Sequence, residues 1–442
     1  MAYNSTDNGY AKFDHVRIPR SALLARYNTV DKDGTYKAHH LRGKLLYGGL
    51  SGGRLLIIRN SAFQLAQALT IATRYSMVRQ QGESRDSIDD PETQIISYKL
   101  QHYRLLTLIS RAYANIFVSM SINEIHKEMQ AEQASGNHRL ISTFHVLSSG
   151  LKAWATQTAA DGAEDARKMC GGHGYLMISG LPEIVLSATA CCTFEGENVV
   201  MWKQVSSYLM KSMAADSLPE DMAYMKNFQD LDSTNIYTES DFLRPEALLE
   251  VFEHRAARLV NEVYVQLQQA KGSRAQAENR FAVELHIAAR AHIDFFILRS
   301  FIEHVSAVTS APIKAVLTRL ILLHALTMIS SPLSLSSATF HFSSTEVGIM
   351  RQHTNDLLEQ LLPDAIALTD AWNFTDASLS SALGCRDGNV YERLMSWTRQ
   401  LPINVQAQAN GGVWEQAWEE GVKPFLKDGK VRTARGLKRG RL

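Results

Sequence analysis

Residues 54–81, RLLIIRNSAFQLAQALTIATRYSMVRQQ, decide the fold class of this chain, because they run without a glycine or a proline. Apolar residues recur along the stretch at alternating steps of four and three, at Ile58, Ala62, Leu65, Leu69 and Ala72. That spacing places all five side chains on one face of an α-helix. The stretch therefore predicts a long helix with a buried face, which begins near Arg54.

Helical patterns continue through most of the chain. Asp90 followed by Pro91 is typical of an N-cap and a first helical residue, and predicts that a second long helix starts there. An apolar stripe of the same period follows at Leu105, Ile109, Ala112 and Ile116. The helical period returns near Leu248 and marks 313–329 and 355–372, with no detectable repeat of about 20 to 50 residues.

Two segments depart from this pattern. Near the start, Phe13, Val16 and Ile18 lie in short strand-like pieces that stop at Pro19. Between residues 214 and 245 the apolar period fades into a polar stretch, which indicates a domain boundary. We therefore expect a mainly α fold, in which a short β segment precedes two helical-bundle domains. The predicted parts are 1–36, 37–213, a linker at 214–245, 246–426 and a basic tail at 427–442.

Composition excludes several classes of function. The 442 residues include 46 basic and 45 acidic side chains, so a net charge of +1 gives no general attraction to nucleic acid or to an anionic membrane. The four cysteines have neither metal-ligand spacing nor a disulfide pattern, and we expect free thiols. No uninterrupted run of about eighteen apolar residues is present, so no membrane span is expected.

Two short motifs carry candidate chemistry. CGGHGY at 170–175 places Gly171 and Gly172 where a backbone could approach a ligand closely, although an ordinary turn between helices fits equally well. His173 has no second histidine or cysteine at ligand spacing, and no metal site is expected. CTFEGENVVMW at 192–202 contains Glu195 and Glu197, which are either functional carboxylates or surface and helix-capping acids.

These motifs and five others resemble peroxisomal acyl-CoA oxidases, and they occur in that family's order. They are DNGY at 7–10, IPR at 18–20, RYSMVR at 74–79, CGGHGY at 170–175, SGLP at 179–182, CTFEGEN at 192–198 and DGNVYE at 387–392. The resemblance covers the chain from Asp7 onward. It implies that residues 1–36 are the tail of a β middle domain, and that the chain is truncated at its N-terminus relative to the family.

The resemblance implies FAD-dependent α,β-dehydrogenation of fatty acyl-CoA to trans-2-enoyl-CoA. Molecular oxygen would be reduced to hydrogen peroxide, in the first step of peroxisomal fatty acid β-oxidation. Glu195, in Phe194-Glu195-Gly196, takes the place of the catalytic base. A glutamate suits that role because a water-poor pocket can raise its pKa toward neutrality. Glu197 is the rival carboxylate, expected to make local hydrogen bonds or to lie at the cofactor rim.

The resemblance also assigns cofactor and substrate residues. Arg79 takes the place of an arginine that meets the pyrophosphate of FAD, often the FAD of the partner subunit. Gly171 and Gly172 are expected beside the dinucleotide, and Gln204 near FAD. Arg54 is a candidate on the acyl thioester side. A solvated helix-end cation is the alternative for Arg79, and a charge that opens a helix is the alternative for Arg54.

This sequence departs from the family at several of these positions. Ser207 stands where relatives have an arginine, which weakens the assignment of Gln204. Val185, Val199 and Ala166 replace residues that are usually Tyr, Thr and Cys, which fits an altered acyl preference in a specialised-metabolite pathway or relaxed selection on the chain.

Two other functions stay open at this point. One is an acyl-CoA dehydrogenase, and the other is a non-catalytic subunit that pairs with a complete oxidase. The family suggests a homodimer, or a dimer with a full-length homologue. The C-terminal Gly440, Arg441 and Leu442 form a degenerate version of a peroxisomal import signal, which predicts a peroxisomal protein.

Overall fold

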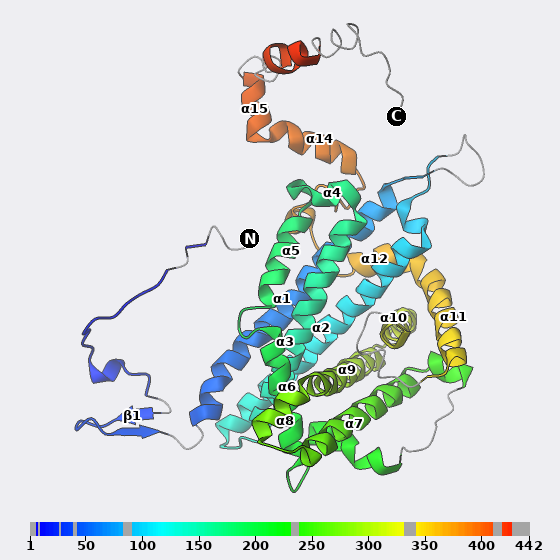
Figure 1. Ribbon diagram of the computed structural model, residues 1–442. Helices are drawn as coiled ribbons and strands as arrows, with labels where there is room; N and C mark the ends of the chain where they lie inside the picture. Colours follow the sequence, from blue (N-terminus) through cyan, green and yellow to red (C-terminus); the bar gives the residue numbers. More distant parts are fainter. Residues whose placement is uncertain are drawn as a thin grey trace, which may run out of the picture.

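The computed structural model describes residues 6–7, 9–25, 28–38, 42–82, 91–230, 238–330, 342–409 and 418–426. Within these residues the chain is a bundle of helices, with one small two-stranded sheet on an arm that leaves the bundle (Figure 1). This confirms the predicted mainly α fold with a short β segment at its start. Residues 427–442, with the basic tail and the C-terminal signal, lie outside the described residues.

The sheet lies later in the chain than the sequence predicts. Strands β1 (Asn28–Val30) and β2 (Tyr36–Ala38) pair antiparallel, with Val30 opposite Tyr36. The prediction of strand-like pieces around Phe13 to Ile18 is wrong. This stretch is irregular and exposed, and a 3-10 turn (Arg20–Ala22) follows it. A strand needs a neighbour for its backbone N–H and C=O groups, and none pairs with this stretch among the described residues.

The first predicted helix exists and is longer than expected. Helix α1 (Arg42–Val78) begins upstream of Arg54 and includes the glycine-containing residues 48–53. The predicted stripe from Ile58 to Ala72 is entirely buried. Arg54 therefore lies inside a helix and does not open one, contrary to the alternative considered for it.

The second long helix starts later than predicted. Helix α2 (Lys99–Ala134) begins after a 3-10 turn (Ile95–Ser97), and Pro91 lies in irregular, exposed chain, while Asp90 lies outside the described residues. The backbone before the turn pairs with the end of α1 instead, since Gln81 N donates to Thr93 O and Ile95 N donates to Arg79 O. These bonds occupy groups that an earlier helix would use. The stripe of α2 is buried at Leu105, Ile109 and Ala112.

The other elements before residue 245 are α3 (Leu140–Met169), α4 (Gly171–Tyr175), a 3-10 turn (Met177–Ser179), α5 (Leu181–Cys191), α6 (Asn198–Met213) and two further 3-10 segments (Glu220–Asp230 and Glu239–Leu243). The later helices are α7 (Pro245–Gln269), α8 (Arg274–Arg280), α9 (Ala282–Ser306), α10 (Ala311–Ser330), α11 (Ser344–Leu361), α12 (Ala365–Asp370), α13 (Asp376–Leu379), α14 (Val390–Gln400) and α15 (Pro402–Ala409). A 3-10 turn (Leu362–Asp364) interrupts the predicted helix at 355–372, at Pro363, and a π-helical turn (Trp418–Val422) follows α15.

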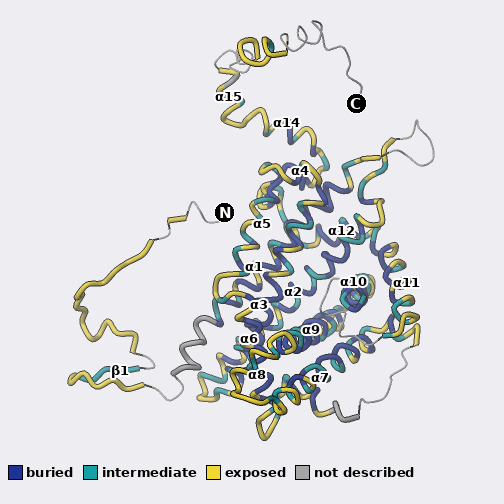
Figure 2. Tube along the Cα trace, viewed as in Figure 1, coloured by how far each residue is buried: buried dark blue, intermediate teal, exposed yellow. Residues whose placement is uncertain are grey.

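Helix α3 lies at the centre of the earlier helices, and α9 at the centre of the later ones. Helix α3 packs against α1, α2, α5 and α6, while α9 packs against α2, α6, α7 and α10. One cluster of buried apolar side chains runs through both groups (Figure 2). The predicted polar linker contributes to it with Met222, Tyr224 and Phe242. The division into two domains at 214–245 remains a prediction.

Among the residues that the structure describes, three helices are long and apolar enough to cross a membrane by length and composition: part of α1, α2 and α10. Between 56% and 61% of the apolar window of each is buried inside the protein. Their apolar faces therefore form the core of the bundle.

Candidate functional site

Glu195 lies on a tight loop that connects α5 to α6. The backbone is left-handed at two consecutive positions, with φ of 55° at Glu195 and 106° at Gly196. Glycine adopts this conformation freely, but a glutamate does so at a cost of about 1 kcal/mol. Glu197, the rival carboxylate, caps α6 by accepting hydrogen bonds from Val199 N at 2.9 Å and Val200 N at 3.4 Å. These contacts are local hydrogen bonds of the kind predicted for Glu197.

The side chain of Glu195 is exposed and lies against α1. A Cβ atom placed on Gly53 would be 3.4 Å from both Cδ and Oε2 of Glu195, so the carboxylate rests over this glycine. Among the described residues the carboxylate has no hydrogen-bond or ion-pair partner. It is therefore available to an external proton donor.

Arg54 holds the backbone of this loop and not the carboxylate. The guanidinium is buried, and its Nε donates to the carbonyl oxygen of Glu195 at 3.2 Å. Its Nη1 donates to Ser149 Oγ at 3.0 Å and lies 3.5 Å from Nδ1 of His145. His145 in turn hydrogen-bonds to Gln204, and burial together with Arg54 lowers the pKa of this histidine. The structure thus brings Glu195, Arg54 and Gln204 to one side of the bundle.

Lys152 of α3 is a residue of this site that sequence reasoning missed. It is fully buried, and its Nζ donates to Gly196 O at 2.7 Å, to Asn198 Oδ1 at 3.0 Å and to Cys192 O at 3.3 Å. Burial lowers the pKa of this amine to about 8. The available signal was a lysine between Leu151 and Ala153 in an otherwise apolar helical stretch.

Arg79 and the two glycines form a second cluster at the other end of α1. They line a pocket of about 800 Å³ together with Tyr75 and His173. A Cβ atom on Gly171 or Gly172 would meet no atom within 4 Å, so the backbone there faces open space. Tyr75 contributes a hydroxyl 2.8 Å from Nδ1 of His173.

A tyrosine close to the C-terminus completes this second cluster. Arg79 donates from Nη1 to the hydroxyl of Tyr391 at 3.2 Å. Tyr391 lies in α14, within the DGNVYE motif at 387–392, so a motif noted in the sequence reaches a predicted cofactor residue. No pattern in the sequence linked the two.

The two clusters are far apart within one chain. Arg54 lies within α1 and Arg79 just past its end, 25 residues later, which corresponds to about 37 Å at the rise of an α-helix. In Figure 1, α4 lies at the upper end of the bundle and α6 at the lower end. The structure therefore does not bring Arg79, Gly171 and Gly172 to Glu195.

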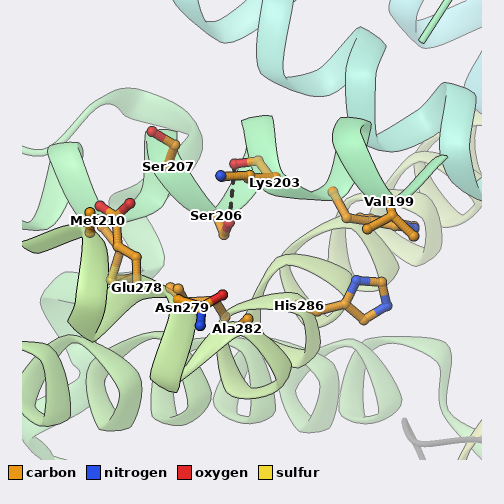
Figure 3. Close-up of a pocket in the computed structure, with 12 residues that line it drawn as sticks. Val199, Lys203, Ser206, Ser207, Met210, Glu278, Asn279, Ala282 and His286 are labelled. Atoms are coloured by element: carbon orange, nitrogen blue, oxygen red, sulfur yellow. Dashed lines mark hydrogen bonds between the residues drawn. The ribbon is translucent and has the colours of Figure 1, made fainter. Parts of the chain in front are cut away.

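A further cavity of about 380 Å³ lies between α6, α8 and α9 (Figure 3). Val199 and Lys203 of α6 face Glu278 and His286 across it, and Trp202 also lines it. None of the six predicted site residues is among those that line this cavity. Within the described part of the chain, no group of three or more His, Cys, Asp or Glu side chains could hold a metal ion.

Comparison with known proteins identifies the family. Residues 47–210 match the family model described as the acyl-CoA oxidase C-alpha1 domain, and residues 244–427 match the model described as acyl-CoA oxidase. Peroxisomal acyl-coenzyme A oxidase 1 of Phascolarctos cinereus is 37% identical over 420 residues, which cover 91% of this chain and 62% of the relative.

Solved structures of acyl-CoA oxidases support the same family assignment. An acyl-CoA oxidase from tomato superimposes with a TM-score of 0.87 at 34% identity, covering 96% of this chain and 65% of that one. Acyl-CoA oxidase-2 of Caenorhabditis elegans, bound with FAD, ascaroside-CoA and ATP, gives a TM-score of 0.82 at 31% identity, over 96% of this chain and 62% of that one. The chain thus spans somewhat less than two thirds of the length of these relatives, and it belongs to the acyl-CoA oxidase family.

Proposed function

We propose that this protein acts in the FAD-dependent α,β-dehydrogenation of fatty acyl-CoA, with Glu195 as the catalytic base. The observation that carries the proposal is the loop at 192–197. It presents an exposed carboxylate from a left-handed backbone, while two buried cations hold its carbonyl groups from beneath. A base needs this combination, because the proton acceptor must face the substrate in a defined position.

The chemical step assigned to this chain is a proton transfer. An oxygen of the Glu195 carboxylate takes the α-proton of the thioester, while the β-hydride leaves with its electron pair and the α,β double bond forms. FAD, when bound, would accept that hydride and pass its two electrons to molecular oxygen, which yields hydrogen peroxide. Arg54 orients the base through its backbone carbonyl and not by pairing with its carboxylate.

The pocket at Arg79 fits the phosphate part of FAD. A guanidinium binds phosphate oxygens in a fork, and the open backbone at Gly171 and Gly172 leaves room for a dinucleotide. Arg79, Gly171 and Gly172 are therefore the residues that would hold the cofactor there. Gln204 lies outside this pocket, beside His145, so its proposed contact with FAD belongs to the Glu195 side of the bundle.

The distance between the two clusters supports an assembly of two subunits. One FAD molecule cannot span the distance of about 37 Å along α1 that separates Arg54, beside Glu195, from Arg79, so a complete site would combine Glu195 of one subunit with Arg79 of another. A homodimer satisfies this requirement, and so does a dimer with a full-length homologue. In the second case this chain could be a non-catalytic subunit.

An oxidase is favoured over an acyl-CoA dehydrogenase because both matching family models describe acyl-CoA oxidase, and together they cover 47–210 and 244–427. The curated relative is named a peroxisomal enzyme, which supports a peroxisomal location. We propose Gly440, Arg441 and Leu442 as the import signal.

The test is the absorbance spectrum of the purified chain before and after anaerobic addition of a long-chain acyl-CoA. A flavin band that bleaches, with peroxide formed on admission of air, supports the oxidase. Glu195→Gln should keep the flavin band and bleach about a thousandfold more slowly. Glu197→Gln is the matched control, because it keeps an oxygen to cap α6 and should bleach at the wild-type rate.

Two other results would count against this assignment. A flavin band and turnover that appear only with a full-length partner would support the non-catalytic subunit. Bleaching without peroxide would support a dehydrogenase.

A further inference from the structure

Lys152 is unusual among the charged residues because it is fully buried and has no carboxylate among its hydrogen-bond partners. Its three acceptors are two backbone carbonyl groups, of Cys192 and Gly196, and the amide oxygen of Asn198. An ammonium group has three N–H donors, so each donor has one acceptor. The groups that contact the ammonium directly are therefore oxygen dipoles, and no carboxylate is bonded to it.

Two of the acceptors, Cys192 and Gly196, belong to the 192–197 loop that carries Glu195, and the third, Asn198, is the first residue of α6. Cys192 precedes Glu195, while Gly196 and Asn198 follow it, so one buried nitrogen ties both sides of the loop to α3. Asn198 is itself fixed, since its Nδ2 donates to Ala153 O at 3.3 Å and to Thr156 Oγ1 at 3.1 Å. The contacts therefore form a single network beneath the loop.

The loop requires such support because its conformation is strained. Glu195 has a positive φ, and the next residue, Gly196, also does. Arg54 holds the carbonyl of Glu195, and Lys152 holds the following carbonyl at 2.7 Å. With both carbonyl groups directed inward, the side chain of Glu195 points outward.

We propose that Lys152 is a positioning residue for the catalytic base: its ammonium group holds the 192–197 loop in the left-handed conformation that directs the Glu195 carboxylate toward the substrate. This inference rests on the proposed function of Glu195. Lys152 does not touch the substrate itself, because its side chain is buried and its three donors are occupied.

The decisive experiment is a double-mutant cycle in the full chain with its cofactor. Lys152→Met keeps the length of the side chain and removes its donors. We expect kcat to fall about a hundredfold, with KM for the acyl-CoA almost unchanged, because the base is displaced while the thioester still binds. In a Glu195→Gln background the same substitution should change the residual rate little, because the positioned carboxylate is already absent.

Amide hydrogen exchange measures the loop without relying on turnover. In Lys152→Met the amides of residues 193–198 should exchange about tenfold faster, and those of α7 should not change. Lys211→Met is the control, since it makes the same substitution at an exposed position of α6 and should affect neither measurement. If Lys152→Met does not fold, Lys152→Gln retains two N–H donors and should show a smaller change in the same direction.

The proposal is overturned if exchange in the loop is unchanged, or if Lys152→Met lowers kcat equally in the wild-type and Glu195→Gln backgrounds. The second result would show a general structural role. If the wild-type chain has no turnover at all, the proposed function fails, and the exchange measurement still decides whether Lys152 holds the loop.

Discussion

At the scale of single residues, the candidate site depends on small details of backbone geometry. Gly53 lacks a side chain where the carboxylate of Glu195 approaches α1, and Gly196 has a φ of 106° with Met201 close to the position of a Cβ. Both glycines lie where an added side chain would meet a neighbour. These requirements explain why the loop between α5 and α6 can present a carboxylate outward.

We predict that Gly53→Val displaces the base. The Cβ alone would be in ordinary contact with Glu195 at 3.4 Å, but the two methyl groups beyond it would occupy the space of the carboxylate. Turnover should fall about a hundredfold with little loss of stability. Gly52→Val is the matched control, because a Cβ there meets no atom within 4 Å. Equal turnover in the two variants, measured as peroxide formation, would contradict the prediction.

At the scale of elements, the end of α1 is fixed to α12 by an ion pair between the buried Arg74 and the partly exposed Asp370. Arg74 is 5% exposed and donates to Asp370 Oδ1 from Nε at 3.1 Å and from Nη2 at 2.7 Å. Its Nη1 donates to the carbonyl of Gly384 at 2.7 Å. This contact joins the RYSMVR motif at 74–79 to the C-terminal part of the fold.

Removal of the acid from this pair should destabilise the protein. Asp370→Ala leaves a buried guanidinium with Gly384 O and a more distant Asp376, and should lower the free energy of unfolding by about 3 kcal/mol. Glu359→Ala removes an exposed partner of Lys99 and should cost at most about 1 kcal/mol. Urea denaturation of both variants tests the difference. Similar losses of unfolding free energy in the two variants would show that burial of Arg74 does not strengthen its ion pair with Asp370.

Helix α10 carries a buried histidine that makes folding sensitive to acid. Among the described residues neither ring nitrogen of His324 has a hydrogen-bond partner, and burial lowers its pKa to about 3. The unfolded chain therefore binds a proton that the folded chain does not, between the ordinary value of 6.5 and about 3. Stability contributed by neutral His324 is present above that ordinary pKa and is lost as pH falls through this window.

We predict that His324→Leu reduces the loss of stability in acid. Thermal unfolding at about pH 7 and about pH 5 should show a smaller decrease in Tm for the variant. Part of the decrease should remain, because burial also lowers the pKa of His292, to about 4. If Tm falls equally in the variant and the wild type, His324 is already protonated, or solvated, in the folded protein.

At the scale of the whole molecule, the separation of Glu195 from Arg79 predicts complementation between subunits. A chain with Arg79→Ala and a chain with Glu195→Gln should each be nearly inactive alone. If a site uses one residue from each subunit, a dimer of the two variants contains one intact site. An equal mixture, refolded together, should therefore recover about a quarter of the wild-type peroxide formation. No recovery would contradict a site shared between subunits.

Part of this architecture was predictable because the signal is local. The stripe from Ile58 to Ala72 predicts α1 since helical period is a property of neighbouring residues. The start of α2 was wrong because Asp90 and Pro91 form a good local cap, yet the backbone at Thr93 and Ile95 pairs with the end of α1. The prediction of strands before Pro19 was wrong because a strand depends on a pairing partner, which the local sequence does not specify.

Local sequence was enough to predict the helical fold class, because helical periodicity depends on residue types at short spacings. The ordered motifs carry the resemblance to acyl-CoA oxidases, and that resemblance, not the spacing, implies Glu195 as the candidate base. The positions of Lys152 and Arg54 beneath the Glu195 loop, and the contact of Tyr391 with Arg79, are visible only in the folded chain. These contacts join residues 44, 141 and 312 positions apart. A buried polar group must find its partners wherever packing places them, and no local pattern specifies that position.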